Sequence, residues 1–98
     1  MKNIIINGKC MTNRKTVHMY LKSKLDIKDY HGNNLDALWD VLSNYDIKVK
    51  ICLINQEVLI SELSNYGQSI IDLFNDVSKE NENISFKVIK NELTQFQN

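Results

Sequence analysis

The segment Ile47-Lys48-Val49-Lys50-Ile51-Cys52-Leu53-Ile54 is the middle one of three strand-like stretches in the chain. Its first half alternates apolar residues with lysines and its second half is uninterrupted apolar sequence, which is typical of a strand that enters the protein from its rim. Helical patterns precede and follow this segment. Strands separated by helices favour parallel pairing through crossover connections. The chain therefore predicts an α/β fold.

A helix is expected immediately before this strand. Apolar residues recur at helical intervals from Leu35 to Tyr45, and Asn34 is the type of residue that caps a helix N-terminus. Residues 26–34 have no hydrophobic period, and they contain glycine and asparagine, which tolerate positive φ angles. We therefore expect a loop at 26–34 and a helix of about ten residues after it.

The N-terminal quarter predicts one strand and one helix. Asn3-Ile4-Ile5-Ile6-Asn7 is a β-branched run closed by Gly8, as expected for a strand that is covered on both faces and central in its sheet. Thr12 is a candidate N-cap for the helix that follows, in which lysines and Arg14 occupy the polar faces. The apolar residues with helical spacing are Val17, Tyr20, Leu21 and Leu25.

The C-terminal half predicts two helices and a last strand. Residues 58–63 favour a short helix, and a longer helix is expected after Gly67 from the spacing of Ile70, Ile71, Phe74 and Val77. Residues 84–89 are apolar enough for a strand, and residues 91–98 are expected to form a polar tail. We therefore expect one domain at 1–90, built on a three-stranded parallel sheet.

Composition indicates whether the chain can form a core by itself and in which compartment we expect it. With 98 residues, of which 43% are hydrophobic, the chain can bury a core without disulfide or metal staples. Cys10 and Cys52 are far apart and lack metal-ligand spacing, and no apolar run is long enough to span a membrane. We expect a cytoplasmic monomer that carries no metal or other cofactor and does not bind a membrane.

Charge is unevenly distributed although the formal net charge is zero. Residues 1–25 carry six basic side chains and no acid, whereas residues 26–46 carry five aspartates against one lysine and residues 51–82 carry six acids against one lysine. Such separation produces a positive end and a negative face, whose field orients a charged partner.

One flank of the helix at 35–45 is a candidate binding surface. At 100° per residue, Asp36, Trp39 and Asp40 fall on one side of the apolar stripe. Asp40 gains nothing from its mid-helix position and repels Asp36 one turn away, so local stability does not explain it. The structural alternative is that Asp40 pairs with a lysine while Trp39 packs into the core. Tyr30 and His31 precede the flank, and together these side chains would complement a basic site that binds phosphate and bases.

The stretch Tyr30-His31-Gly32-Asn33-Asn34-Leu35-Asp36-Ala37-Leu38-Trp39-Asp40 closely resembles the signature segment of the barstar family, bacterial inhibitors of the ribonuclease barnase. Residues 1–8 look like the first strand of that family, and residues 67–89 look like its last helix and strand. The resemblance covers about residues 1–90. It implies a barstar-like fold, in which a three-stranded parallel sheet packs with four helices, and an inhibitor that blocks a ribonuclease active site with its second helix.

The resemblance also implies roles for individual residues. Asp40 matches the aspartate that stands in for a substrate phosphate, Asp36 matches a neighbouring charged contact, and Tyr30 matches a tyrosine that packs at the base-binding region of the enzyme. Asp76 takes the place of an acidic contact that is glutamate in barstar. The whole expected partner-binding set is Tyr30, His31, Gly32, Asn34, Leu35, Asp36, Trp39, Asp40 and Asp76.

Some positions depart from the barstar pattern. His31 stands where a second tyrosine is expected, Asn33 replaces a glutamate, and Tyr45 replaces a tryptophan. Barstar is acidic overall whereas this chain is neutral, so we expect slower and less salt-sensitive association with a barnase-like partner.

Two other functions remain open from the residues. The basic first helix, with Tyr20 near it, is compatible with a small nucleic-acid-binding protein, and the fold could serve as an interaction module for a different protein. An enzyme is not expected, because His18 lies beside an apolar stripe and neither cysteine has a histidine near it in the sequence.

Overall fold

The computed structural model describes residues 2–28, 30 and 32–90. The elements along the chain are β1 (Lys2–Asn7), the 3-10 turn η1 (Gly8–Cys10), α1 (Arg14–Leu25), α2 (Leu35–Ser43), β2 (Val49–Ile54), α3 (Gln56–Leu63), α4 (Asn65–Glu80) and β3 (Ile84–Ile89). The three-stranded parallel sheet and the four α-helices are those expected of a barstar-like α/β fold. The polar tail expected at 91–98 lies outside the described residues.

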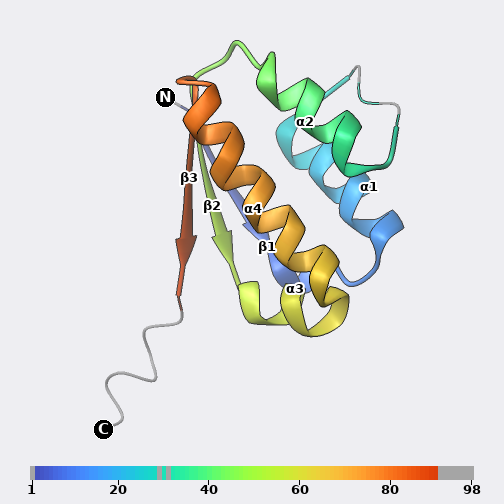
Figure 1. The fold of residues 1–98 in the computed structure, drawn as a ribbon. Helices are drawn as coiled ribbons and strands as arrows, with labels where there is room; N and C mark the ends of the chain where they lie inside the picture. Colours follow the sequence, from blue (N-terminus) through green and yellow to red (C-terminus); the bar gives the residue numbers. More distant parts are fainter. Residues whose placement is uncertain (1, 29, 31, 91–98) are drawn as a thin grey trace, which may run out of the picture.

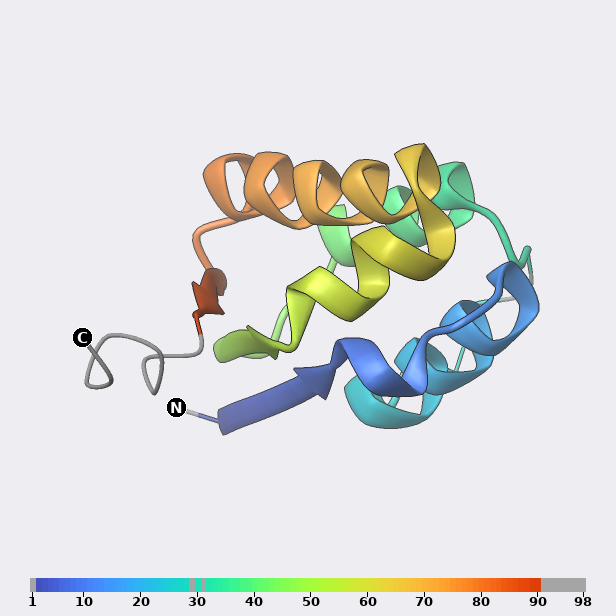
Figure 2. The ribbon, with the colours of Figure 1, turned by 90° about the horizontal axis from the view of Figure 1, so that it is seen from below.

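The sheet order is β1-β2-β3, so β2 is the central strand. Ile51 pairs with Ile4 on one side and with Phe86 on the other. The expectation that residues 3–7 form the central strand is wrong. Ile4 and Ile6 are buried, but Ile5 between them is 53% exposed, because the helices lie to one side of the sheet (Figures 1 and 2). A run of three isoleucines does not require cover on both faces.

α1 is capped by Asn13 and not by Thr12. The Asn13 side-chain oxygen accepts a hydrogen bond from the backbone N–H of Thr16 at 2.9 Å, which satisfies one of the free donors of the first turn. The helix ends at Asp26, whose φ of 53° is left-handed and stops the helical repeat.

α4 begins two residues before Gly67 instead of after it. A Cβ atom at Gly67 would lie 2.7 Å from the backbone oxygen of Leu59, so the missing side chain lets α4 cross close to α3. Glycine here allows tight helix packing and does not mark a helix start.

One continuous core joins the described elements. The inward side chains of the strands, such as Ile51, meet Leu38 from α2 and Phe74 from α4, and all three are fully buried. α2 and α4 run beside each other on the same side of the sheet (Figure 1). Their outer faces are therefore neighbours, although more than twenty residues separate them along the chain.

Candidate functional site

The N-terminus of α2 forms as the sequence predicts. The Asn34 side-chain oxygen accepts a hydrogen bond from the backbone N–H of Ala37 at 2.8 Å, and Asp36 lies in the first turn, where the helix dipole favours a negative charge. Leu38 and Leu42 are buried beneath the helix. The cap and the apolar stripe together fix which side of α2 faces solvent.

The predicted flank of α2 is presented at the surface. Asp36 and Asp40 are exposed, whereas Leu35 and Trp39 are half-buried and pack against the core. Trp39 therefore fits the structural alternative only in part, because it packs against the core but remains half-buried at the surface. For Asp40 the structure records only a hydrogen bond to its backbone oxygen, which accepts from Nδ2 of Asn44 at 2.9 Å. No lysine within the described chain holds the Asp40 carboxylate in a recorded ion pair.

A groove of about 330 Å³ separates α2 from α4. The structure here brings Asp76 next to Asp36, two of the residues that the sequence placed in one site. Asp72 also lines the groove and was missed by the sequence analysis, although it lies one helical turn before Asp76 on α4. Its carboxylate accepts a hydrogen bond from Gln68 at 3.0 Å. The complete lining is Leu35, Asp36, Trp39, Ser69, Asp72, Leu73 and Asp76.

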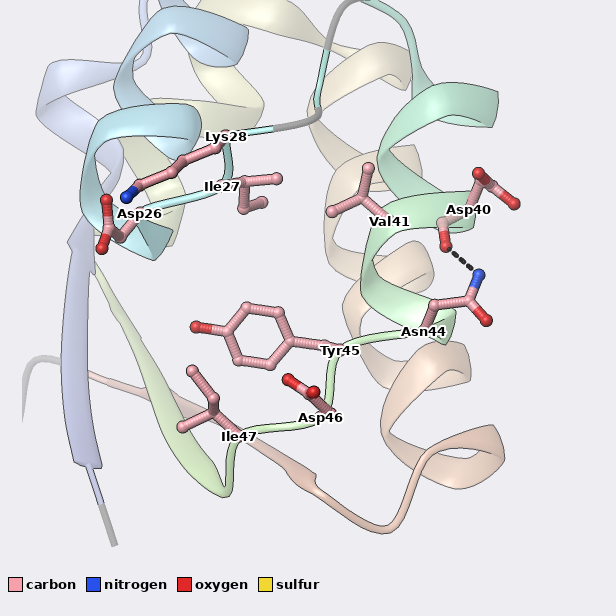
Figure 3. A pocket seen from close by; sticks show the side chains of 9 residues that line it. All are labelled: Asp26, Ile27, Lys28, Asp40, Val41, Asn44, Tyr45, Asp46 and Ile47. Carbon is pink, nitrogen blue, oxygen red and sulfur yellow. Dashed lines mark hydrogen bonds between the residues drawn. The ribbon is translucent and has the colours of Figure 1, made fainter.

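A second hollow, of about 410 Å³, lies on the other side of α2 (Figure 3). Ile27 and Val41 project into it, and Tyr45 crosses it to donate a hydrogen bond from its hydroxyl to the backbone oxygen of Leu25 at 3.1 Å. Asp40 lies at its edge with the carboxylate pointing away from the Tyr45 ring. Asp40 is thus presented outward on a ridge between the hollow and the groove.

Tyr30 is placed differently from the other predicted contacts. Its side chain is only 1% exposed, and its hydroxyl donates to the backbone oxygen of Asn34 at 3.3 Å and is hydrogen-bonded to Nδ1 of His18. Burial, with a smaller contribution from Tyr66, raises the pKa of Tyr30 to about 12. In this conformation Tyr30 supports α2 from below and is not part of the free surface. His31 lies outside the described residues.

Gly32 does not have a positive φ, contrary to the reason given for a glycine in this loop. A Cβ atom at Gly32 would instead lie 2.8 Å from Cβ of Ala37. Glycine is therefore needed for close packing of the loop against the first turn of α2. Gly32 thus packs against α2, and Asn34 caps the same first turn.

The described residues contain no cluster of three or more histidine, cysteine or acidic side chains arranged to hold a metal ion. Cys10 and Cys52 are free thiols. His18, which the sequence placed beside an apolar stripe, is fully buried and hydrogen-bonded to tyrosines at both ring nitrogens. None of the described helices is long and apolar enough to cross a membrane.

Comparison with known proteins agrees with the fold. The chain is 37% identical over 90 residues to a protein of Bacillus subtilis (strain 168) named "Putative ribonuclease inhibitor YrdF", an alignment that covers 91% of this chain and 98% of that protein. The sequence model of the family described as "Barstar (barnase inhibitor)" matches residues 1–91. The chain therefore belongs to the barstar family.

Proposed function

We propose that this protein is an intracellular inhibitor of a barnase-like ribonuclease and that it blocks the enzyme active site with α2 and the loop before it. Family membership and the name of the Bacillus subtilis relative support the inhibitor role. We propose that the active form is a cytoplasmic monomer, which binds the enzyme in place of its substrate.

The observation that carries the proposal is the exposed acidic ridge on α2. Asp40 projects from it, with Asp36 one turn earlier and Asp76 across the groove. A ribonuclease active site must bind a phosphodiester, so it presents basic side chains. A carboxylate surrounded by guanidinium groups forms short, charge-assisted and often bidentate hydrogen bonds. We propose that Asp40 occupies the place of the substrate phosphate.

The surroundings of Asp40 suit such a role. Half-buried Leu35 and Trp39 flank the carboxylates with apolar surface, which excludes water when a partner docks and strengthens the charge interactions. The rigid cap at Asn34 and the packed stripe below keep the ridge in one geometry. Little ordering is then required on binding, which favours affinity.

The test is an inhibition titration against a barnase-like ribonuclease. Asp40→Ala is expected to weaken inhibition more than Asp76→Ala, because Asp40 lies at the centre of the proposed contact and Asp76 at its side. Glu57→Ala, which removes an exposed acid from α3, is the matched control and should leave inhibition unchanged. Unchanged affinity of Asp40→Ala would exclude the assignment.

A capture experiment distinguishes the other two functions. Tagged protein is incubated with native cytosol and secretome, and the captured fraction is assayed for ribonuclease activity released on dissociation. Salt-sensitive RNA binding by the protein alone, without any effect on ribonuclease activity, would favour nucleic-acid binding through the basic α1. Capture of a protein that has no ribonuclease activity would favour an interaction module with another partner.

A further inference from the structure

His18 on α1 is held between two tyrosines that come from other parts of the chain. Its Nε2 lies 2.5 Å from the hydroxyl of Tyr66 on α4, and its Nδ1 is hydrogen-bonded to the hydroxyl of Tyr30 in the loop before α2. Both phenol rings meet the imidazole edge-on, with centroids 6.1 and 5.7 Å away. The imidazole itself is fully buried. One side chain thus joins two helices to the loop that leads into the proposed inhibitory surface.

The hydrogen bonds of this cluster run in one direction. We assign the Tyr30 hydroxyl proton to the backbone oxygen of Asn34, and on this assignment the Tyr30 oxygen accepts the proton on Nδ1 of His18. Nε2 is then the unprotonated nitrogen of the neutral ring and accepts the hydroxyl proton of Tyr66. The chain runs from Tyr66 through His18 and Tyr30 to Asn34, the N-cap of α2.

Protonation of His18 would put a positive charge on a fully buried ring. A second proton on Nε2 would point at the Tyr66 hydroxyl, which would have to turn its own proton away. The titratable and charged groups recorded around the ring are Tyr30 from the loop, Tyr66 from α4 and Arg14 on α1, whose guanidinium lies 4.3 Å from the centre of the Tyr66 ring. No carboxylate within the described chain is recorded against the imidazole. Burial lowers the pKa of His18 from its ordinary value of 6.5.

We propose that His18 is a positioning residue for the inhibitory surface: the neutral imidazole holds Tyr30 beneath the N-terminus of α2, and protonation of Nε2 breaks the bond from Tyr66 and favours a state in which the charged ring leaves its buried position, which frees Tyr30 and weakens ribonuclease binding. This inference rests on the proposed function, because it concerns the regulation of the same surface. It assigns Tyr30 a supporting role through Asn34 in place of direct contact. Inhibition becomes pH-dependent through a side chain that touches no partner.

The sign follows from proton linkage. The ordered, binding-competent state disfavours the imidazolium, whereas a state with Tyr30 released lets His18 titrate nearer 6.5. Acidification below that value therefore favours the released state. Affinity is full above about pH 7 and falls as the pH drops, by at most about tenfold per pH unit because a single proton is involved.

The first experiment measures the inhibition constant for a barnase-like ribonuclease between pH 5 and 8 with the wild type and His18→Gln. Titrations of the enzyme are common to both, so the ratio of the two constants isolates His18. Gln keeps an amide donor and acceptor but does not titrate. The variant is expected to bind more weakly at pH 7.5 and to lose the acid dependence, so that the two proteins converge toward pH 5.5. Parallel pH profiles would overturn the proposal.

Tyr66→Phe is the matched variant, since it keeps His18 and removes only the hydroxyl that donates to Nε2. The neutral ring loses a stabilising partner, so the acid midpoint of inhibition is expected to move to higher pH while the dependence itself remains. A role of His18 in packing alone would predict no shift of the midpoint. Tyr66→Phe with an unchanged midpoint would therefore also count against the proposal.

A readout without the enzyme separates this inference from the proposed function. Nitrogen chemical shifts of the histidine ring in the full-length protein, assigned in a His31→Gln background, are expected to show His18 protonated at Nδ1 and free at Nε2 at pH 7.5. Proton uptake below pH 6.5 should coincide with a change in the Tyr30 ring signals. An Nε2–H tautomer, or uptake without a Tyr30 change, would overturn the relay. If the relay is observed but no barnase-like ribonuclease is inhibited, only the proposed function fails.

Discussion

At the scale of single residues, the structure separates side chains that present the surface from those that support it. Asp36, Asp40 and Asp76 are exposed, whereas Tyr30, which shares the same sequence segment as Asp40, is buried. The resemblance to the barstar family placed the exposed and the buried residues in the same partner-binding set. Burial and hydrogen bonding give the two groups different roles, because a buried phenol can affect binding of a partner only by positioning its neighbouring residues.

Gly32→Ala is expected to destabilise the fold by about 1–3 kcal/mol, the usual cost of forcing an extra carbon into a packed contact. The new Cβ would meet Cβ of Ala37, which is fixed to the helix backbone and cannot turn away. Urea unfolding measures the effect. Ala37→Gly is the control, with an expected cost of about 1 kcal/mol from helix propensity. The double variant should be less destabilised than the sum of the two, and strict additivity would contradict the contact.

Tyr30 should make stability fall in alkaline solution. Its pKa is raised from 10.0 to about 12 by burial in the folded protein, so the unfolded chain ionises first. Stability that is complete below pH 10 is lost progressively between pH 10 and 12. Urea midpoints across this range are expected to fall less steeply for Tyr30→Phe than for the wild type. Identical slopes would mean that Tyr30 ionises normally in the folded state.

At the scale of elements, local signals placed each helix and strand, and packing corrected their ends and order. Asn34 begins α2 as predicted, because a side-chain cap acts within one turn. The predicted start of α4 and the predicted central position of β1 were wrong, because Gly67 and the isoleucine run make contacts with distant parts of the chain. The far end of α2 is held by such a contact as well, from Asn81 at the end of α4.

Asn81→Ala is expected to destabilise the protein by about 1–3 kcal/mol. The buried side-chain amide of Asn81 donates to the backbone oxygens of Leu42 and Tyr45, each at 2.9 Å, and alanine leaves these acceptors without that donor. Denaturant unfolding gives the free energy. Asn81→Asp keeps the shape but replaces the donor with an acceptor, so it should cost at least as much. A near-neutral result for both variants would show that water replaces the amide.

At the scale of the whole molecule, a neutral chain carries a strongly divided charge. The acidic ridge and groove lie on α2 and α4, whereas α1 carries a set of exposed lysines. A field of this kind orients a basic partner near contact, but it attracts less at long range than a net negative charge does. The distribution therefore favours correct docking over rapid encounter.

Association with a barnase-like ribonuclease is expected to be slower and less salt-dependent than association of an acidic barstar. Stopped-flow rates measured across ionic strength test this. Asn33→Glu, at an exposed position beside the site, should raise the rate at low salt and steepen its salt dependence. Ser61→Glu adds the same charge on α3 and should have a smaller effect. Equal effects of the two variants would mean that the association rate depends on net charge and not on where the charge lies.

The amino-acid sequence by itself determined the α/β class, the cap and apolar stripe of α2, and the acidic flank with Trp39. These features depend on residues within one or two turns of each other, where propensity and periodicity act. The tertiary structure alone decided that β2 is central, that Asp72 joins Asp36 and Asp76 in one groove, and that Tyr30 lies beneath the surface against His18. Hydrogen bonds across 12 and 48 residues hold that last arrangement, and no local pattern in a single sequence encodes which distant side chains will meet.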